Sequence, residues 1–260
     1  MEVRLDGRTA LITGGSKGLG LAMASTFAAA GAKVVIAARD ADTLAKAEAE
    51  INAANQGAAK AIPTDVTDPA ACKALFDGAC SQFGQVDILV NNAGQSQTGK
   101  FEDITDEIWE ADLALKLMAQ VRLSRLAFGP MKERRWGRII NVLNTGAKAP
   151  RAGGAPTAVT RAAGMALSKV MAGEGAPHNV LVNAMNTGLI VSDQHVRRWE
   201  ASDKSKTLDE FLADMGKNLP MGRLGSSQEF ANLACFLASD AAGYINGTAI
   251  NVDGGMCPVV

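Results

Sequence analysis

The chain has 260 residues, and its 26 basic side chains against 27 acidic ones give a net charge of −1. Such a balance gives no electrostatic reason to expect nucleic acid or an anionic membrane as a partner. No uncharged apolar run reaches the 18 residues of a membrane span, and the first eight residues lack the apolar segment of a signal peptide. A cytoplasmic protein without membrane or nucleic-acid partners is therefore the expectation.

The four cysteines show no spacing typical of a metal site and form no CxxC motif. Cys72 and Cys80 are eight residues apart on one expected helix, a spacing that suits packing better than metal binding. Because disulfides are rare in reducing compartments, we expect four free thiols and no metal site.

Short β-branched runs alternate with longer alanine-rich stretches along the whole chain. Seven strands are expected, within residues 9–13, 33–38, 58–66, 86–91, 137–143, 179–185 and 248–255. The main helices are expected near residues 18–30, 42–54, 69–83, 105–134 and 156–174. Strands that are apolar on both faces and separated by helices indicate a parallel sheet covered on both sides. The predicted fold is thus α/β, a doubly wound seven-stranded parallel sheet of Rossmann type, in a single domain over residues 1–260.

Residues 192–217 depart from this alternation, because they are polar and charged, with Trp199 and Phe211 embedded among them. They follow the sixth expected strand, and ligands of such folds bind at the carboxyl ends of the strands. Two interpretations remain open at this point, a mobile substrate lid and a solvated helical insertion.

Gly14, Gly18 and Gly20 lie in the sequence TGGSKGLG, between the first expected strand and the first expected helix. Glycines let the backbone turn tightly and approach a pyrophosphate, and the helix N-terminus offers free N–H groups. A glycine-rich loop alone is a weak signal, but one that opens a strand–helix–strand unit is much stronger. The pattern therefore predicts a dinucleotide site.

Six motifs spread over nearly the whole chain make it similar to one family. They are TGxxxGxG at 13–20, DVTD at 65–68, NNAG at 91–94, GRIIN at 137–141, VNA at 182–184 and SDAAGYINGTAINVDGG at 239–255. Together they resemble the short-chain dehydrogenase/reductase family. The resemblance implies an oxidoreductase that binds a nicotinamide dinucleotide.

The resemblance also implies where the cofactor lies. Asp65 and Val66 would flank the adenine, and Asn92, Ala93 and Gly94 would run past the ribose and the nicotinamide. The remaining positions implied to bind it are Gly14, Ser16, Lys17, Gly18, Leu19, Gly20, Arg161, Gly188, Ile190 and Ser192.

The choice between NAD(H) and NADP(H) depends on the end of the second strand. An acid there would bind the ribose hydroxyls of NAD, whereas an arginine would accept the 2′-phosphate of NADP. This chain has Ala38 followed by Arg39, and Lys17 lies within the glycine-rich loop. Both basic positions face the 2′-phosphate in similar proteins, so NADP(H) is favoured over NAD(H).

Members of the family transfer protons with a tyrosine, assisted by a lysine four residues later, a serine and an asparagine. Counted from the flanking motifs, these four positions carry Thr157, Arg161, Asn144 and Lys116 in this chain. A threonine hydroxyl is far less acidic than a phenol, whose pKa is about 10, and proton transfer needs a pKa near the working pH. Arg161 can still donate to ribose hydroxyls and Asn144 to a carbonyl oxygen, while Lys116 would donate a proton only if desolvation lowered its pKa.

Other candidate groups are weaker. Tyr244, the only tyrosine, matches a structural aromatic of the family, and His178 is expected to be a solvated or capping residue. His195 lies in the 192–217 segment near the implied nicotinamide site, where its titration would be useful, although a lone histidine is more often incidental. Lys148 and Arg151 either join Arg161 and Lys116 in a basic pocket for an anionic substrate or simply face water.

Three functions remain open on this sequence. The first is an NADP(H)-dependent oxidoreductase with an atypical mechanism, acting on a small carbonyl, alcohol or activated alkene, since the cofactor itself carries the hydride chemistry. The second is a catalytically silent NADP(H)-binding sensor or assembly partner, and the third is a non-redox enzyme that kept the fold. The apolar helix expected at 156–174 further predicts a homodimer or homotetramer, because a helix that is apolar all round is buried.

Overall fold

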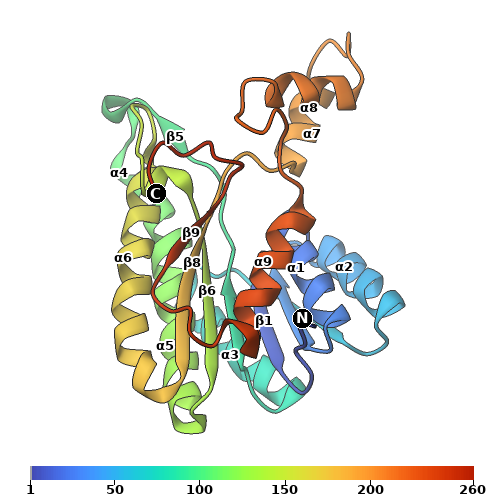
Figure 1. The fold of residues 1–260 in the computed structure, drawn as a ribbon, viewed down its shortest axis with the longest axis vertical. Coiled ribbons are helices and arrows are strands. Elements are labelled where there is room, and N and C mark those ends of the chain that lie inside the picture. The colour runs from blue at the N-terminus through green and yellow to red at the C-terminus, as the bar shows by residue number, and fades with distance from the viewer. Residues whose placement is uncertain (1) are drawn as a thin grey trace.

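The computed structural model describes residues 2–260, apart from the side chains of residues 193, 194 and 197. Seven parallel strands form one sheet in the order β3-β2-β1-β4-β6-β8-β9 (Figure 1). Their bounds are β1 Thr9–Thr13, β2 Lys33–Ala38, β3 Ala59–Pro63, β4 Ile88–Asn91, β6 Gly137–Asn144, β8 Val180–Thr187 and β9 Ala249–Val252. The predicted doubly wound seven-stranded sheet is confirmed. Its strand order reverses between β1 and β4, which is where such sheets bind ligands.

Helices cover both faces of the sheet (Figure 1). One face carries α1 Gly18–Ala29, α2 Ala41–Ala54 and α9 Ser227–Ala238, and the other carries α3 Pro69–Phe83, α5 Ala119–Arg134 and α6 Thr157–Gly175. A hydrophobic core lies on each face of the sheet, and alternate residues of a strand point into the two cores. Ile12 packs in one core with Phe27, whereas Leu11 packs in the other with Leu123. This two-sided burial explains why the strands are apolar on both faces.

The long helical region expected at 105–134 is divided in the structure. It consists of α4 Asp106–Leu113, a π-helical turn η2 at Ala114–Met118, and α5. Lys116 lies inside this π turn and its side chain is buried. Single π turns within α-helices are frequently found at functional sites.

A small second sheet was not expected from the sequence. It pairs β5 Thr98–Gly99 antiparallel with β7 Ala155–Pro156, directly before α6. The short 3-10 helices are η1 Phe101–Asp103, η3 Thr145–Ala147, η4 Ala176–His178 and η5 Asp240–Ala242. The β5–β7 pair holds the chain before α6 against the segment that follows β4.

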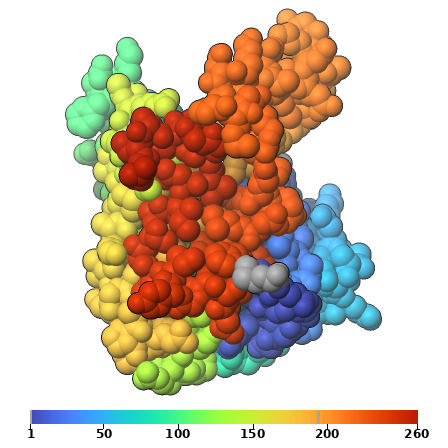
Figure 2. All heavy atoms as spheres, in the orientation of Figure 1, coloured from blue at the N-terminus to red at the C-terminus, as the bar shows by residue number. Residues whose placement is uncertain are grey.

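The 192–217 segment contains two helices, α7 Asp193–Glu200 and α8 Leu208–Gly216, which stand out from the body of the protein (Figure 2). A capping box formed by Thr207 and Glu210 starts α8. No helix in the described part of the chain is long and apolar enough to cross a membrane. All four cysteines are free thiols, as predicted.

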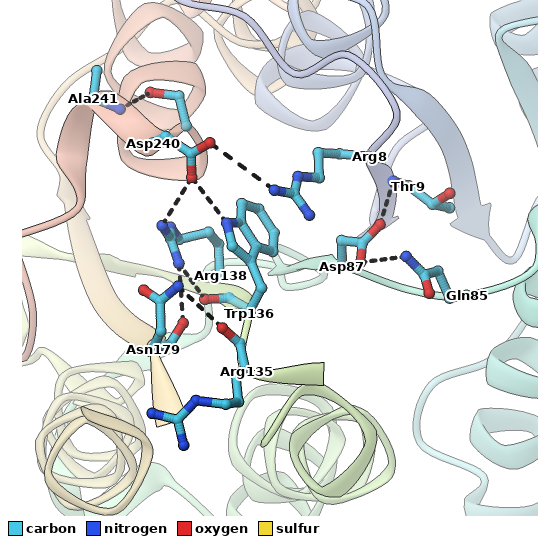
Figure 3. A network of polar contacts seen from close by, with 12 residues as sticks. Arg8, Thr9, Gln85, Asp87, Arg135, Trp136, Arg138, Asn179, Asp240 and Ala241 are labelled. Atoms are coloured by element: carbon cyan, nitrogen blue, oxygen red, sulfur yellow. Dashed lines mark hydrogen bonds and ion pairs between the residues drawn. The ribbon is translucent and has the colours of Figure 1, made fainter. Parts of the chain in front are cut away.

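A polar cluster connects Asp240 of η5 to the start of β6 (Figure 3). Arg138 at the start of β6 is 2% exposed, and burial lowers its pKa to about 10. Its guanidinium carbon lies 4.4 Å from the centre of the Trp136 ring, and Arg8 lies over the same ring at 3.6 Å. Asp240 accepts from Trp136 Nε1 at 2.9 Å and from Arg138 Nη2 at 3.4 Å. The Asp240 carboxylate therefore offsets a desolvated guanidinium.

Replacing Asp240 with alanine is expected to destabilise the fold, because Arg138 would stay buried without a carboxylate. Asp240 is largely exposed, so we expect a loss of about 1–3 kcal/mol in the free energy of unfolding, between the values for exposed and buried pairs. Urea denaturation of the variant and of the unmodified protein measures this loss in the free energy of unfolding. Glu174→Ala removes an exposed carboxylate from α6 and is the control, expected to change stability by less than about 0.5 kcal/mol. Equal stability of the two variants would contradict this assignment.

Candidate functional site

A cavity of about 580 Å³ lies at the carboxyl ends of the strands. Its walls come from the glycine-rich turn after β1, the segment after β4, the end of β6 and η3, the start of α6 and the segment after β8. These parts are far apart in the sequence and meet because parallel strands end at the same edge of the sheet. The cavity is therefore the candidate binding site.

The glycine-rich turn is held too tightly for side chains. A Cβ on Gly20 would lie 2.0 Å from the carbonyl oxygen of Gly14, and Gly14 itself has a φ of +65°. Lys17 occupies the N-cap position of α1 without a capping side-chain bond, and the first turn of the helix holds no acidic residue. The N–H groups at this helix start are thus available to an anion such as a pyrophosphate.

Asn92 fastens the end of β4 to this turn. Its side-chain Nδ2 donates to the carbonyl oxygens of Thr13 at 2.9 Å and Gly14 at 3.1 Å. The hydroxyl of Thr13 accepts from the backbone N–H groups of Asn92 and Ala93, both at 3.0 Å. Asn92 therefore shapes the cofactor side of the cavity by holding the turn, in addition to lining the cavity with its own atoms.

The structure brings most of the predicted site residues to this one cavity. Those that line it are Gly14, Ser16, Lys17, Gly18, Leu19, Gly20, Asn92, Gly94, Asn144, Thr157, Arg161, Gly188, Ile190 and Ser192. The predicted residues outside its lining are Arg39, Asp65, Val66, Ala93 and Lys116.

The ends of β2 and β3 form the region expected to hold the adenosine. Arg39 directly follows β2 and is exposed. Asp65, after β3, has a pKa lowered chiefly by hydrogen bonds from Thr67, with a smaller contribution from Arg39. Asp40 caps α2 by accepting from the backbone N–H of Thr43 at 2.7 Å, so this acid is engaged in starting a helix.

A groove next to the glycine-rich turn is lined by two cations, Lys17 and Lys46 of α2, and by one acid, Glu50 of the same helix. Sequence reasoning missed Lys46, because a lysine on an exposed helix face usually carries no specific signal. Together with Arg39, these cations make this end of the site suited to an additional phosphate.

Thr157 is the first residue of α6, and its hydroxyl lies between the backbone of Gln97 and the side chain of Lys116. It donates to the carbonyl oxygen of Gln97 at 2.6 Å, and it accepts from the Gln97 backbone N–H at 3.0 Å and from Lys116 Nζ at 2.6 Å. The β5–β7 pair fixes Gln97 in this position. The hydroxyl thus joins the cavity wall to a buried ammonium group.

Lys116 forms an ion pair with Asp112, one helical turn earlier, and both side chains are buried. Asp112 also accepts from the hydroxyl of Thr160 at 2.7 Å. Burial lowers the pKa of Lys116, Asp112 opposes that shift, and the nearby charge of Arg161 adds to it. Sequence reasoning missed Asp112, although its i, i+4 spacing from Lys116 on an expected helix was a usable signal.

Arg161 lines the cavity as a buried cation. Its Nη1 donates to the carbonyl oxygen of Val142 at 2.6 Å, and its Nη2 would lie 2.4 Å from a Cβ on Gly94. Burial lowers its pKa to about 10, with Asp112 opposing the shift. Within residues 2–260 no carboxylate lies at ion-pair distance from Arg161, and its Nε has no hydrogen-bond partner. This guanidinium is charged at neutral pH and suited to hold a ligand oxygen.

Asn144 ends β6 and lines the same cavity. Its side-chain oxygen Oδ1 is buried and has no hydrogen-bond partner in the described structure. Buried polar atoms are normally paired, so an unpaired amide at a cavity wall indicates a place for a ligand or water.

His195, on α7, also lines the cavity. The backbone N–H of Ser192 donates to His195 Nδ1 at 3.2 Å, which leaves the proton of the neutral ring on Nε2. Burial lowers the pKa of His195 and the charge of Arg198 lowers it further, so the ring is neutral at pH 7.

The basic pocket considered for an anionic substrate is not formed. Of its four proposed members only Arg161 lines the cavity, since Lys116 is paired with Asp112, and Lys148 and Arg151 lie outside the lining. Tyr244 is fully exposed. The described residues contain no group of three or more histidine, cysteine or acidic side chains that would hold a metal ion.

Residues 14–257 match the family model described as Enoyl-(Acyl carrier protein) reductase. The chain is 36% identical over 255 residues to the 3-oxoacyl-[acyl-carrier-protein] reductase of Escherichia coli K12, covering 98% of this chain and 99% of that protein.

Solved structures agree with these sequence matches. L-Sorbose reductase from Gluconobacter frateurii, complexed with NADPH and L-sorbose, has a TM-score of 0.95 and 34% identity, with 100% of both chains covered. An NADPH-bound short chain oxidoreductase from Pseudomonas aeruginosa PAO1, described as containing an atypical catalytic center, has a TM-score of 0.92 and 35% identity, with 99% of both chains covered. This chain is therefore an oxidoreductase of the short-chain dehydrogenase/reductase family.

Proposed function

We propose that this protein is an NADP(H)-dependent oxidoreductase that transfers hydride to or from a small carbonyl, alcohol or activated alkene by an atypical mechanism. The observation that carries the proposal is a single cavity that joins the glycine-rich turn to Asn144, Thr157 and Arg161. A dinucleotide laid along the turn would place its reactive ring among these three side chains.

The cofactor assignment is supported by the charges at the adenosine end. Arg39, Lys17 and Lys46 are cationic, whereas Asp40, the nearest acid along the chain, caps α2. Several structural relatives contain NADPH, among them the Gluconobacter and Pseudomonas enzymes. The guanidinium of Arg39 and the ammonium groups of Lys17 and Lys46 would favour the 2′-phosphate of NADP(H) over the free hydroxyl of NAD(H).

The local geometry fits a dinucleotide. The tight turn packs Gly20 against the backbone of Gly14 with no room for a Cβ, which keeps the start of α1 open, and Asn144 Oδ1 and Arg161 Nε are buried without partners. In this proposal Arg161 would hold the nicotinamide ribose, and the Nδ2 group of the Asn144 amide would donate to the substrate oxygen. The bound nicotinamide supplies the hydride.

The protein would thus be a divergent family member that lacks the usual serine, tyrosine, lysine and asparagine. Thr157, Arg161, Asn144 and Lys116 stand at those positions by sequence and lie together in the structure. The Pseudomonas relative with an atypical catalytic center supports the idea that the fold accepts such changes.

Two further parts belong to this proposal. Residues 192–217 would form a substrate lid, since Ser192 and His195 line the cavity while α8 stands away from the body (Figure 2).

The protein would assemble as a homodimer or homotetramer through α6, where Val159 and Val170 are exposed.

Fluorescence titration with NADPH and NADH tests the cofactor assignment. We expect NADPH to bind at least about 10-fold more tightly, because one charge-assisted hydrogen bond contributes about 1.5–3 kcal/mol. Arg39→Asp should remove most of that preference by weakening NADPH binding. Lys73→Asp reverses an exposed charge on α3 and is the matched control, with the preference unchanged. Equal binding of NADPH and NADH by the unmodified protein would contradict the assignment, and binding of neither would overturn the proposed function.

A further inference from the structure

The buried pair of Lys116 and Asp112 has no explanation in stability. Each ion loses its hydration on burial, and this cost offsets the attraction between the two charges, so buried pairs often contribute no net stability. The pair lies where α4 passes into the π turn, one of the less regular parts of the helix. Both charged side chains are buried, and the hydroxyl group that Lys116 contacts lies at the wall of the cavity.

That hydroxyl belongs to Thr157, which lines the cavity. Lys116 Nζ donates to Thr157 Oγ1 at 2.6 Å, while its other described bond goes to Asp112. Asp112 is in turn fixed by the hydroxyl of Thr160 at 2.7 Å. These contacts form a continuous chain of hydrogen bonds from a buried carboxylate, through an ammonium group, to a hydroxyl at the cavity wall.

We propose that Lys116 supplies the proton of the reaction through the hydroxyl of Thr157, and that Asp112 is the positioning residue that holds its ammonium group. The inference rests on the proposed oxidoreductase function, and it identifies the group that provides the proton, to which the proposed function assigns no residue.

The step balances in the reducing direction. Hydride adds to the carbonyl carbon, and the electron pair of the C=O bond moves to oxygen. The Thr157 hydroxyl, which donates to the Gln97 carbonyl oxygen at 2.6 Å in the structure, turns toward the substrate oxygen. Its O–H bond breaks as the O–H bond of the product forms, and an N–H bond of Lys116 breaks to restore the Thr157 hydroxyl. Lys116 is left as a neutral amine, which regains a proton from water through Thr157 after the product leaves the cavity.

The chemistry of an ammonium group suits this role. A threonine hydroxyl alone is too weak an acid, but a lysine has an ordinary pKa of about 10.4, close to the value of about 10 for a phenol. Burial lowers the pKa of Lys116 below its ordinary value, toward the working pH. The charged groups that face it are Asp112 from α4, which opposes this shift, and Arg161 from α6, which adds to it. A lysine behind a threonine thus provides the acidity that a tyrosine would.

A comparison of two hydride acceptors isolates the proton step. Reduction of an aliphatic ketone leaves an alkoxide, a strong base that must be protonated as it forms, whereas reduction of an ortho-quinone leaves a phenolate, a far weaker base because a phenol has a pKa of about 10. NADPH oxidation is followed with the ortho-quinone and with a panel of aliphatic ketones that includes L-sorbose. Thr157→Val removes the hydroxyl at nearly constant volume, and Thr157→Ser keeps it. The double variant Asp112→Asn, Lys116→Met removes both buried charges together, so that neither is left unpaired.

We expect Thr157→Val and the double variant to lose at least about 100-fold in ketone reduction, within the usual range for a proton-transfer group, and less than 5-fold in quinone reduction. Thr157→Ser should retain ketone reduction. Thr26→Val, which removes a threonine hydroxyl from α1, is the control and should leave both rates unchanged. With the unmodified protein, ketone reduction should fall as the pH rises, at a lower pH than an ordinary lysine would require.

The outcomes separate this inference from the function on which it rests. Equal losses for quinone and ketone, or ketone reduction that survives in Thr157→Val, would overturn the proton route while leaving the oxidoreductase in place. Quinone reduction by a protein that reduces no ketone in the panel would also overturn it. Absence of NADPH binding, or binding without reduction of the quinone, of any ketone in the panel or of an activated alkene, would overturn the proposed function itself.

Discussion

Replacing Gly20 with alanine is expected to abolish useful cofactor binding. The added Cβ would lie 2.0 Å from the carbonyl oxygen of Gly14 and 2.8 Å from Asn92 Nδ2. The Asn92 amide donates to that same carbonyl oxygen, so the two groups hold each other in place. Forced overpacking of this kind costs about 1–3 kcal/mol, and occasionally more. We expect a loss of about 2 kcal/mol in the free energy of unfolding and at least about 100-fold in NADPH affinity, because the turn must open where the pyrophosphate would lie.

Gly173→Ala is the matched control for this variant. Gly173 lies on the exposed side of α6, and a Cβ there would meet no atom within 4 Å. Alanine in a helix is more stable than glycine by about 0.5–1 kcal/mol, so this variant should be slightly stabilised and bind NADPH normally. Urea denaturation and fluorescence titration of both proteins measure the two quantities. NADPH binding by the Gly20 variant at the unmodified affinity would show that the cofactor does not lie on this turn.

Arg161→Met is expected to move stability and binding in opposite directions. The guanidinium is buried without a carboxylate partner, and its pKa of about 10 reflects the cost of that desolvation. Apolar replacement of buried charged groups can stabilise a protein by about 1–4 kcal/mol, and we expect a gain of about 1–2 kcal/mol here. The same change removes the donors proposed for the nicotinamide ribose, which should weaken NADPH binding by at least about 10-fold.

Arg161→Lys separates the charge from the packing in this test. The lysine keeps a cation at the position where the family places one, so it should retain most of the NADPH affinity. The unfolding temperature of the unliganded proteins and the NADPH titration provide the two measurements. A methionine variant that is less stable but binds NADPH normally would mean that Arg161 is part of the structural core and not of the cofactor site.

The sheet was predictable because its signal is repeated in every strand. Residues such as Leu11 and Ile12 face opposite cores, so each strand had to be apolar throughout, which distinguishes a parallel sheet covered on both sides. The cofactor loop was predictable for a different reason. A Cβ on Gly20 would overlap the backbone of Gly14, and Gly14 has a φ of +65°, so both positions favour glycine.

The inner part of the site was only partly predictable. Asp112 is an acid on an expected helix, and such residues are usually solvated, so its i, i+4 spacing indicated a pair with Lys116 but not that the pair is buried beneath the cavity wall. The β5–β7 pair has two residues in each strand, too few to give an alternating pattern, yet it places Gln97 against Thr157. The direction of Lys148 depends on loop geometry that residue types do not encode, so the sequence left open whether it joins a basic pocket or faces water, and the structure places it outside the cavity lining.

The central claim is that bound NADPH is used in a reaction despite the four changed positions. It is tested most directly by incubating the protein with NADPH deuterated on the transferring carbon, together with a panel of small ketones, aldehydes and activated alkenes, and measuring deuterium in the products by mass spectrometry. We expect at least one product to carry a single deuterium at the former carbonyl or alkene carbon. A protein that binds NADPH tightly but yields no deuterated product over hours would contradict the account and would be a silent cofactor-binding protein.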